Sequence, residues 1–440
     1  MRRRILAGAL AALLAVTATG CASRPGDDRP VPFDAHRSTD LTVWNGWNGR
    51  EAAAFHTVVR DFTRLHPNVH VSIVDGVDDS TIMTSIRGGY PPDVAAIGST
   101  TTMGTYCSTG AFRDLTGYLR RDHVTTRYAP VIRRLLDFHG TQCVMPGGVD
   151  TFGLYYNTDR FAQAGLDRPP RTWSEFVADA KKLTTYNPDG SIRTLGFDPL
   201  FSFQQNTAIH WSPSFGAGLY DAHGRSALAA NPGWRRMFEA QRQLVAAIGY
   251  QKLQRFQAGL GAEMSAANAF QAGKVAMQFD GEWRTAFIAD QAPKLSYDTA
   301  GLPVADDRAG TYGAGFVDTG VFGIPQGARE PGAAWELVKY LTQTRAAQVK
   351  FYGALGNVPS LPSAASDPAF TKRPHFGTFV DIMNNPHSGS GTPTTLGRAD
   401  KDALDQFAER WQAGRVPDLA AGLRGLARQI DDLTRNANPP

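Results

Sequence analysis

The 440-residue sequence contains only three cysteines, and this scarcity excludes several classes of protein. A disulfide-rich scaffold or a zinc site built from four cysteines would need more thiols. The sequence also lacks the His-Glu-x-x-His, Gly-x-Ser-x-Gly and phosphate-loop motifs that indicate zinc peptidases, serine hydrolases and nucleotide-binding proteins. Because no Lys- and Arg-rich run with interleaved aromatic residues is present, nucleic acid is not an expected partner. We predict that the protein needs no metal and no cofactor.

No segment is long and apolar enough to predict a transmembrane helix, because the apolar run from Ile5 to Val16 is too short to cross a bilayer. This run follows three arginines and precedes small residues, a pattern typical of an export signal. The residues before Cys21 resemble the lipobox of bacterial lipoproteins. We therefore expect residues 1–20 to be removed and Cys21 to be acylated, which would anchor the protein to the outer face of the cell membrane; a plain secretory signal is the alternative. Residues 21–40 are rich in Pro, Asp and Arg, which predicts a flexible tether.

The mature chain would be nearly neutral. Removing residues 1–20 removes three arginines and no acidic residue, so the net charge falls from +4 to +1. A chain of this length exceeds the size at which single cores stop growing, and we expect two lobes. Export permits disulfides, and an even pair in that compartment is more often bonded than free. We therefore predict a bridge between Cys107 and Cys143.

Predicted strands alternate with helices over much of the chain, which favours a mostly parallel sheet covered on both faces. The carboxyl ends of such strands form ligand clefts, and polar loops follow two of them at Asn45–Asn48 and Ser99–Thr102. Gly147 and Gly148 separate two predicted strands, and we interpret this pair as a hinge. The predicted strands are residues 41–44, 69–74, 93–97, 142–145, 152–156, 274–279 and 321–324.

The stretch Ala269–Trp283 (AFQAGKVAMQFDGEW) is expected to finish a helix, form a strand over residues 274–279 and turn at Asp280. Glu282 and Trp283 would then emerge at the carboxyl end of that strand. An indole covers the apolar C–H faces of a polyhydroxylated ligand, and a carboxylate accepts hydrogen bonds from its hydroxyls. The alternative for Trp283 is a place in the core.

Five segments of the chain are similar to extracellular solute-binding lipoproteins of bacterial ABC sugar importers, the family 1 sugar-binding proteins related to maltose-binding protein. The segments are LTVWNGWNGREAAAFHTVVRDFTRLHPNVHVSI, PDVAAIGSTTTMGTYCSTGAFRDLTGYL, GLYYNTDRFAQAGLDRPPRTWSEFVADAKKL, AFQAGKVAMQFDGEW and GVFGIPQGAREPGAAWELVKYL. The resemblance implies a two-lobed α/β fold, each lobe a mostly parallel sheet flanked by helices, with a multi-segment hinge that closes on ligand. The positions of Cys107 and Cys143 resemble those of actinobacterial members.

We assign residues 41–148 and 303–343 to lobe I, and residues 149–302 and 344–440 to lobe II. Most of the candidate ligand-binding residues are carried over from the family resemblance. They are Trp47, Asn48, Glu51, Ser99, Thr100, Asp150, Trp211, Phe215, Asp280, Glu282, Trp283, Gly313 and Gly315. The aromatic stretch of residues 201–215, which supplies two of them, could be a buried crossing instead.

The predicted function is that of a monomeric, non-enzymatic binder that captures a carbohydrate in the cleft and delivers it to a membrane permease. A glycerol-phosphate or glycerophosphodiester ligand is the alternative, and it would require cationic groups in the cleft, where Arg50 and Arg284 are the only basic neighbours. A secreted glycoside hydrolase is the rival class, since Asp150 with Asp280 or Glu282 could imitate a catalytic carboxylate pair. A purely structural surface lipoprotein is a third class.

Overall fold

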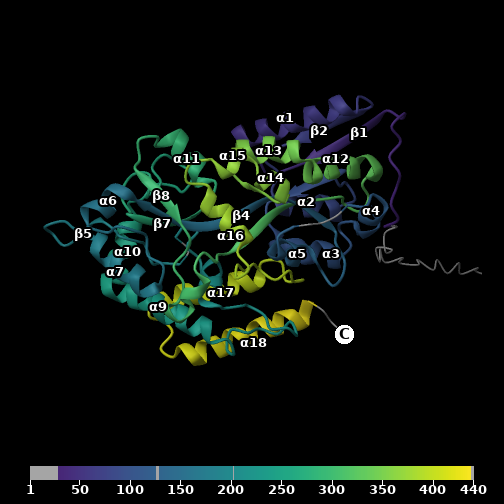
Figure 1. Cartoon of the computed structure of the whole chain (residues 1–440). Coiled ribbons are helices and arrows are strands. Elements are labelled where there is room, and N and C mark those ends of the chain that lie inside the picture. The colour runs from purple at the N-terminus through teal and green to yellow at the C-terminus, as the bar shows by residue number, and fades with distance from the viewer. Residues whose placement is uncertain (1–27, 125–127, 202, 438–440) are drawn as a thin grey trace, which may run out of the picture.

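The computed structural model describes residues 28–124, 128–201 and 203–437, which form two lobes that lie side by side (Figure 1). The predicted signal peptide and Cys21 lie outside these residues. Among the described residues, no helix has both the length and the apolar character needed to cross a bilayer.

Lobe I is built on a sheet whose first three strands are parallel. β1 pairs with β2 from Thr39↔Val69 onward, and with β3 at Val43↔Val94. The order of the sheet is β2 (Val69–Val74), β1 (Thr39–Trp44), β3 (Val94–Ile97), β9 (Val317–Gly323), β4 (Val144–Asn157) and β10 (Val358–Pro359). The strands predicted at residues 41–44, 69–74 and 93–97 are confirmed to within two residues.

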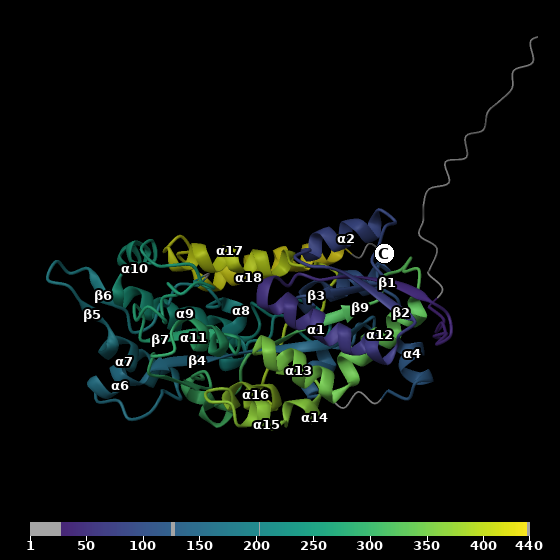
Figure 2. The ribbon, with the colours of Figure 1, turned by 90° about the horizontal axis from the view of Figure 1, so that it is seen from above.

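Three long helices of lobe I, α1, α12 and α13, lie together (Figure 2). α1 forms because Phe55, Val58 and Phe62 recur at helical spacing, and all three are buried. The helices of this lobe are α1 (Gly49–Leu65), α2 (Asp79–Arg87), α3 (Met103–Ser108), α4 (Thr116–Arg121), α5 (Pro130–Leu136), α12 (Pro331–Gln343) and α13 (Arg345–Leu355).

β4 belongs to both lobes. Its first half pairs with β9 and β10, and its second half pairs antiparallel with β7 (Met277–Gly281) and β8 (Tyr297–Ala300). The two strands predicted at residues 142–145 and 152–156 are therefore one strand, with a register shift between Pro146 and Val149 in place of a break. The expectation of a mostly parallel sheet is wrong for lobe II, because the crossing strand lies between β7 and β8 and opposes both.

The glycines at the crossing are needed for close packing. A Cβ on Gly147 would lie 2.6 Å from Oη of Tyr352, and one on Gly148 would lie 2.7 Å from Cε1 of the same ring. Such distances are much shorter than van der Waals contact. Gly147 and Gly148 therefore allow the Tyr352 ring to pack directly against β4, where any side chain would clash with it.

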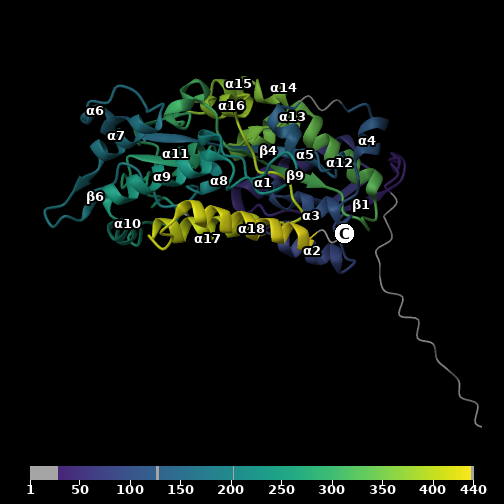
Figure 3. The ribbon, with the colours of Figure 1, turned by 90° about the horizontal axis from the view of Figure 1, so that it is seen from below.

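Lobe II carries the remaining long helices. Thr172 caps α7 by accepting a hydrogen bond from the Glu175 amide, as the sequence Thr-Trp-Ser-Glu predicts. α17 and α18 lie along the underside of the molecule in Figure 3, where Leu423, Leu426 and Ile430 bury one face of α18. The helices are α6 (Thr158–Gln163), α7 (Trp173–Leu183), α8 (Ala208–Trp211), α9 (Pro232–Ile248), α10 (Tyr250–Gln257), α11 (Arg284–Gln291), α16 (Gly377–Asn384), α17 (Ala399–Gln412) and α18 (Leu419–Ala437). The short helices α14 (Pro362–Ala365) and α15 (Pro368–Thr371) and the short strands β5 (Thr185–Tyr186) and β6 (Ile192–Thr194) complete the fold.

The assigned lobe boundaries need two corrections. α13 packs on lobe I, since the Phe351 ring lies 5.0 Å from Trp47 and Lys350 forms an ion pair with Asp61. Residues 303–316 begin instead on lobe II, where the Val304 amide donates to the Arg171 carbonyl at 3.0 Å. The chain thus crosses at β4, at β9 and between β10 and α16.

The segment predicted to be a flexible tether packs against lobe I from residue 28 onward. Gln326 donates to the Asp28 carboxylate at 2.6 Å, and the Val31 amide donates to the Tyr118 hydroxyl at 3.1 Å. The prediction is therefore wrong for residues 28–40, because polar partners in lobe I fix their path.

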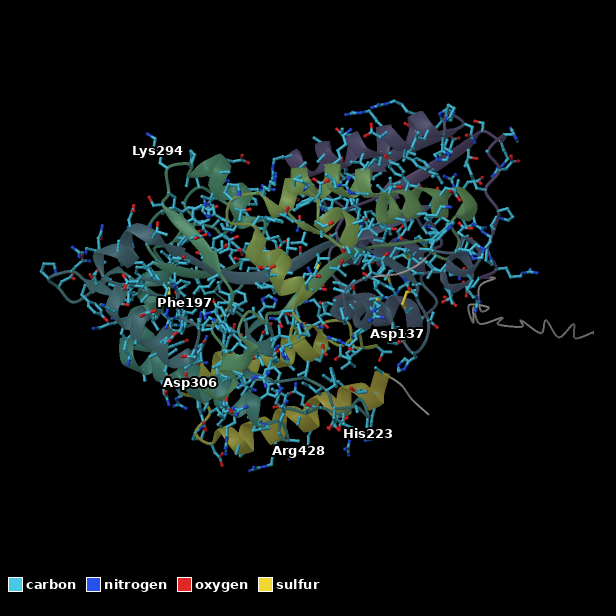
Figure 4. All side chains as sticks on the ribbon, in the orientation of Figure 1. Asp137, Phe197, His223, Lys294, Asp306 and Arg428 are labelled. Atoms are coloured by element: carbon cyan, nitrogen blue, oxygen red, sulfur yellow. A yellow bond between two sulfur atoms is a disulfide. The ribbon has the colours of Figure 1, made fainter. Side chains whose placement is uncertain are left out.

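The predicted disulfide between Cys107 and Cys143 is present, with the two Cα atoms 5.7 Å apart. It is the yellow bond near Asp137 in Figure 4. The bridge ties α3 to the residue that precedes β4.

Candidate ligand-binding site

Two cavities adjoin the crossing strands and form one cleft between the lobes. The first, which we name the Asp318 cavity, has a volume of about 310 Å³. The second, the Trp47 cavity, has a volume of about 490 Å³. Asp150 and Trp283 line both, so the cavities are neighbours. Their volumes fall within the range of small-molecule sites.

Trp47 and Trp283 line the Trp47 cavity from opposite lobes. Trp47 is supported by the Phe55 and Phe351 rings, each at 5.0 Å between centroids. Trp283 precedes α11 and meets the Phe152 ring edge-on at 5.7 Å. Two half-buried indoles, each held by packed aromatic rings, therefore flank one opening.

Three polar side chains from three segments meet behind this opening. Nδ2 of Asn357 donates to Asp150 at 2.8 Å and to Glu282 at 2.7 Å, while the Thr151 amide donates to Glu282 at 2.8 Å. Burial, and then the nearby charge of Asp318, raises the pKa of Asp150 to about 7. Burial, and then the charge of Asp150, raises the pKa of Glu282 well above its usual range. The pair therefore retains a proton near neutral pH.

Asp318 on β9 forms the second polar centre of the cleft. Its carboxylate accepts hydrogen bonds from Ser99 Oγ at 2.5 Å and from the Thr100 amide at 3.2 Å. All three residues line the Asp318 cavity. Ser99 and Thr100 thus reach the cleft as predicted, whereas sequence reasoning missed Asp318.

His210 lines the Asp318 cavity as a neutral acceptor. Its Nδ1 lies 2.8 Å from the Gln205 carbonyl oxygen, which can only accept, so Nδ1 carries the proton. Burial lowers the pKa of His210 to about 4, and its ring stacks on Phe152 at 4.2 Å. Nε2 consequently offers a lone pair. His210 is thus a hydrogen-bonded residue of the cavity wall.

Three cationic side chains also line the cleft, and each already faces a carboxylate. Arg50 lies 4.0 Å from Asp290, and Arg398 lies 3.4 Å from Asp402. Lys401 lies 3.9 Å from Asp400. Sequence reasoning missed Arg398 and Lys401, which follow a loop far along the chain from the strands of the sheet. Among the described residues, no group of three or more His, Cys, Asp and Glu side chains is arranged to hold a metal.

Seven of the thirteen predicted ligand-binding residues line the cleft. They are Trp47, Asn48, Glu51, Ser99, Thr100, Asp150 and Trp283. The other six line neither cavity, and each has a structural role instead.

Asp280 and Glu282 are buried behind the cleft wall. β7 continues to Gly281, so the turn expected at Asp280 is absent. The Asp280 carboxylate instead accepts a hydrogen bond from Arg284 Nε at 2.7 Å inside lobe II. Ala269–Ala272 is a turn and not the helix end that the sequence predicted.

Trp211 and Phe215 belong to the core of lobe II. Trp211 donates to Asn206 at 2.6 Å and packs against Phe279, and Phe215 meets the Trp173 ring at 5.3 Å. A buried crossing is therefore the correct interpretation for Trp211 and Phe215, while Gln205, Thr207, Ile209 and His210 of the same stretch line the Asp318 cavity.

Gly313 and Gly315 serve close packing beside α16. A Cβ on Gly315 would lie 2.9 Å from the Ile382 side chain. Gly313 packs closely on Gly301, because a Cβ added to Gly301 would lie 2.8 Å from the Cα of Gly313. Neither glycine touches the cleft, because the return loop lies against residues 382–388.

The family model described as "Bacterial extracellular solute-binding protein" matches residues 46–348. A binding protein of Brucella abortus is 26% identical over 266 residues, and the match covers 60% of this chain and 61% of that relative. The multiple sugar-binding protein of Streptococcus mutans is 27% identical over 328 residues, covering 72% of this chain and 74% of the relative. The chain thus spans about three fifths of the length of the first of these relatives.

Solved structures share the fold. CpMnBP1 with mannotriose bound superposes with a TM-score of 0.78 at 23% identity, covering 89% of this chain and 99% of that chain. The sugar-binding protein MalE of Xanthomonas citri gives a TM-score of 0.75 at 20% identity, covering 90% and 98%. The two-lobed arrangement of these binding proteins is therefore the fold of this chain.

Proposed function

Since the chain belongs to the bacterial extracellular solute-binding proteins, a family of non-enzymatic binding proteins, we propose that its solute is a carbohydrate held in the cleft between the lobes. The observation that carries the proposal is the pair of indoles, Trp47 and Trp283, on opposite walls of one cavity. Aromatic faces cover the C–H surfaces of a sugar ring. The Streptococcus mutans relative is a multiple sugar-binding protein and CpMnBP1 holds mannotriose, and both support the same solute class.

The polar groups of the cleft favour hydroxyl donors over an anionic ligand. Among the described residues, the carboxylates of Asp150 and Asp318 accept hydrogen bonds only from neutral donors. Each cation that lines the cleft faces a carboxylate within 4.0 Å. These nearby carboxylates offset the charge that a phosphodiester would need, whereas a sugar hydroxyl can donate to Asp150, Asp318 or His210 directly. We therefore favour a carbohydrate over a glycerophosphodiester.

The carboxylate arrangement also argues against glycoside hydrolysis. A hydrolase needs two carboxyl groups that flank one scissile bond. Asp150 lines the cleft, but Glu282 is buried and bonded to Asn357 and the Thr151 amide, and Asp280 is paired with Arg284. Neither partner named for Asp150 in the hydrolase interpretation lines the cleft, and Asp318, which does, is held by hydrogen bonds from Ser99 and Thr100.

The remaining parts of the function are proposals from the sequence. We propose that Cys21 carries lipid and holds the protein at the outer face of the cell membrane. The ligand-closed form, selected through its higher affinity for sugar, would then be the form that an ABC permease binds. The protein would act as a monomer.

Titration calorimetry tests the solute class directly. The ligands are mannobiose, mannotriose, maltotriose, diacetylchitobiose, glycerol 3-phosphate and glycerophosphocholine, and mass analysis of each mixture reports any hydrolysis. Saturable heat with at least one neutral oligosaccharide and none with the phosphates supports the proposal. Binding of the phosphates alone, or turnover of any sugar, would contradict it.

A further inference from the structure

The Ser/Thr/Gly/Pro-rich segment between α16 and α17 has both ends fixed to lobe II. We name residues 388–398 the strap. At its start the Gly389 amide donates to the Gly315 carbonyl at 3.0 Å, and the Val317 amide donates to the Gly389 carbonyl at 2.8 Å. At its end α17 packs on α9, where Trp411 Nε1 donates to the Phe238 carbonyl at 2.9 Å. The strap is therefore a part of lobe II by its attachments.

The strap contacts lobe I at its start and in its middle. At its start Arg134 on α5 donates to the Ser388 carbonyl at 3.5 Å. Thr105 on α3 donates its hydroxyl to the Thr395 carbonyl at 3.2 Å. A Cβ on Gly104, also on α3, would lie 2.3 Å from the carbonyl oxygen of Thr394 and 2.8 Å from its amide nitrogen. Backbone therefore passes directly over Gly104, and any side chain at that position would displace it. In Figure 3 the yellow chain that precedes α17 reaches toward α3.

The strap also forms one wall of the Asp318 cavity. Gly391, Thr392 and Pro393 line this cavity together with Asp150 and Asp318, which come from the crossing strands. The cavity thus lies between two of the crossing strands, β4 and β9, on one side and the strap on the other. The Trp47 cavity has no strap residue in its lining.

We propose that the strap closes one end of the cleft and fastens the lobes over the terminal unit of a bound oligosaccharide. The terminal unit occupies the Asp318 cavity, and the rest of the chain passes Trp283 into the Trp47 cavity. The ligand class is therefore an oligosaccharide recognised at one end, not a polymer bound along its length. The identity of the ligand as a sugar rests on the proposed function.

The composition of the strap suits repeated release and refastening. Residues 388–397 (SGSGTPTTLG) contain three glycines and no charged side chain. Release from α3 breaks the hydrogen bond from Thr105 and the backbone packing contact with Gly104. Surface loops with few apolar contacts open at low free-energy cost, and such segments commonly control ligand release.

Gly104→Ala tests the contact without altering a residue that lines the cleft. Gly425→Ala is the matched control, because both glycines are helical and a Cβ on Gly425 meets no atom within 4 Å. Hydrogen exchange of the ligand-free proteins is followed in peptides that cover residues 388–398. We expect exchange about tenfold faster in Gly104→Ala and unchanged in Gly425→Ala. Thr105→Val, which replaces the hydroxyl with a methyl group, should give a smaller change in the same direction. Unchanged exchange in both α3 variants overturns the proposal, and circular dichroism checks that each variant is folded.

End recognition is tested with mannotriose, maltotriose and diacetylchitobiose, each native and modified at the reducing end or the non-reducing end. We expect modification of one end alone to abolish binding, and Gly104→Ala to speed dissociation of the native sugar about tenfold. Equal tolerance of both modified ends, or an unchanged dissociation rate despite faster strap exchange, overturns the proposal. If no sugar binds the wild-type protein, the proposed function fails, and the exchange measurement alone decides whether the strap is fastened by Gly104.

Discussion

Asp150 and Glu282 accept hydrogen bonds from one nitrogen atom, Nδ2 of Asn357, at 2.8 and 2.7 Å. The three residues come from the crossing strand β4, the end of β7 and the segment before β10. One amide group therefore links the structures of the two lobes at the point where the chain crosses, and two carboxyl groups there share a small buried volume.

The first prediction concerns pH. The pKa of Asp150 is raised to about 7 by burial and by Asp318, so this group binds more protons in the folded than in the unfolded protein. The free energy of unfolding should accordingly fall as the pH rises from about 4 to 7. Asp150→Asn should remove much of this dependence and raise the melting temperature at pH 8 by about 2 °C.

Thermal melts from pH 4 to pH 8 make this measurement. Asp381→Asn is the control, because Asp381 is an exposed acid on α16. A pH profile of Asp150→Asn that overlays the wild-type profile would contradict the assignment of the raised pKa to this pair.

The second prediction concerns the indoles of the cleft. Trp283→Ala should weaken sugar binding by about 2–4 kcal/mol, because a central aromatic anchor of a binding site contributes that much. Tyr186→Ala, at an exposed aromatic residue in the β5–β6 hairpin, should leave the affinity unchanged. Calorimetry with the sugar that binds the wild-type protein gives both values. An affinity change within error would show that Trp283 serves packing against Phe152 alone.

The third prediction separates a structural carboxylate from a ligand-binding one. Asp280 and Arg284 are both fully buried and form an ion pair at 2.7 Å. Asp280→Asn removes the nearer carboxylate of the buried guanidinium and leaves only Glu263, at 4.0 Å, among its ion-pair partners in the described residues, so it should lower the free energy of unfolding by about 3–5 kcal/mol. The folded protein should bind sugar with wild-type affinity.

The exposed pair Arg235–Glu239 supplies the control. Arg235→Ala should change stability by less than about 0.5 kcal/mol. If Asp280→Asn instead retained full stability and lost binding, Asp280 would have to contact the ligand, contrary to its burial.

The fourth prediction concerns the disulfide. The bridge spans 36 residues of sequence, and loss of a loop constraint of that size should lower the free energy of unfolding by about 3–4 kcal/mol. The double variant Cys107→Ser, Cys143→Ser should therefore melt earlier than the wild type, and reductant should shift only the wild type. Two alkylatable thiols at these positions in the unreduced protein would contradict the bridge.

The sequence predicted the parts of the site that follow from local pattern. Trp47 and Ser99 each follow a short segment whose apolar residues predict a strand. The pattern of residues alone therefore places both at the carboxyl ends of strands. Trp283 was found for a related reason, although its strand ends two residues later than expected. Resemblance to a known family then placed Asp150.

The residues that were missed depend on contacts between distant segments. Asp318 precedes the strand that was expected to begin at Val321, and its role arises from pairing with Ser99 more than two hundred residues earlier. Asn357 and Lys401 likewise reach the cleft through helices whose packing no local pattern specifies.

The errors have a similar origin. Trp211 and Phe215 lie in a stretch without clean periodicity. Aromatic residues are common both in a protein core and in the wall of a ligand site, so composition alone does not distinguish the two. Asp280 was wrongly placed because the strand ends two residues later than predicted, so Asp280 lies within it and its carboxylate faces Arg284.

The shared strand β4 has a consequence for the order in which the protein can fold. Lobe I contains the first strand of the chain, yet its sheet is complete only when β9 and β10 have joined it, and these are translated after most of lobe II. An emerging chain that ends before residue 317 leaves the edges of β3 and of the first half of β4 unpaired, which favours aggregation. Neither lobe can therefore be completed early, because lobe I needs β9 and β10 and lobe II needs the still later helices α16, α17 and α18. Truncation before residue 317 would leave neither half able to fold alone.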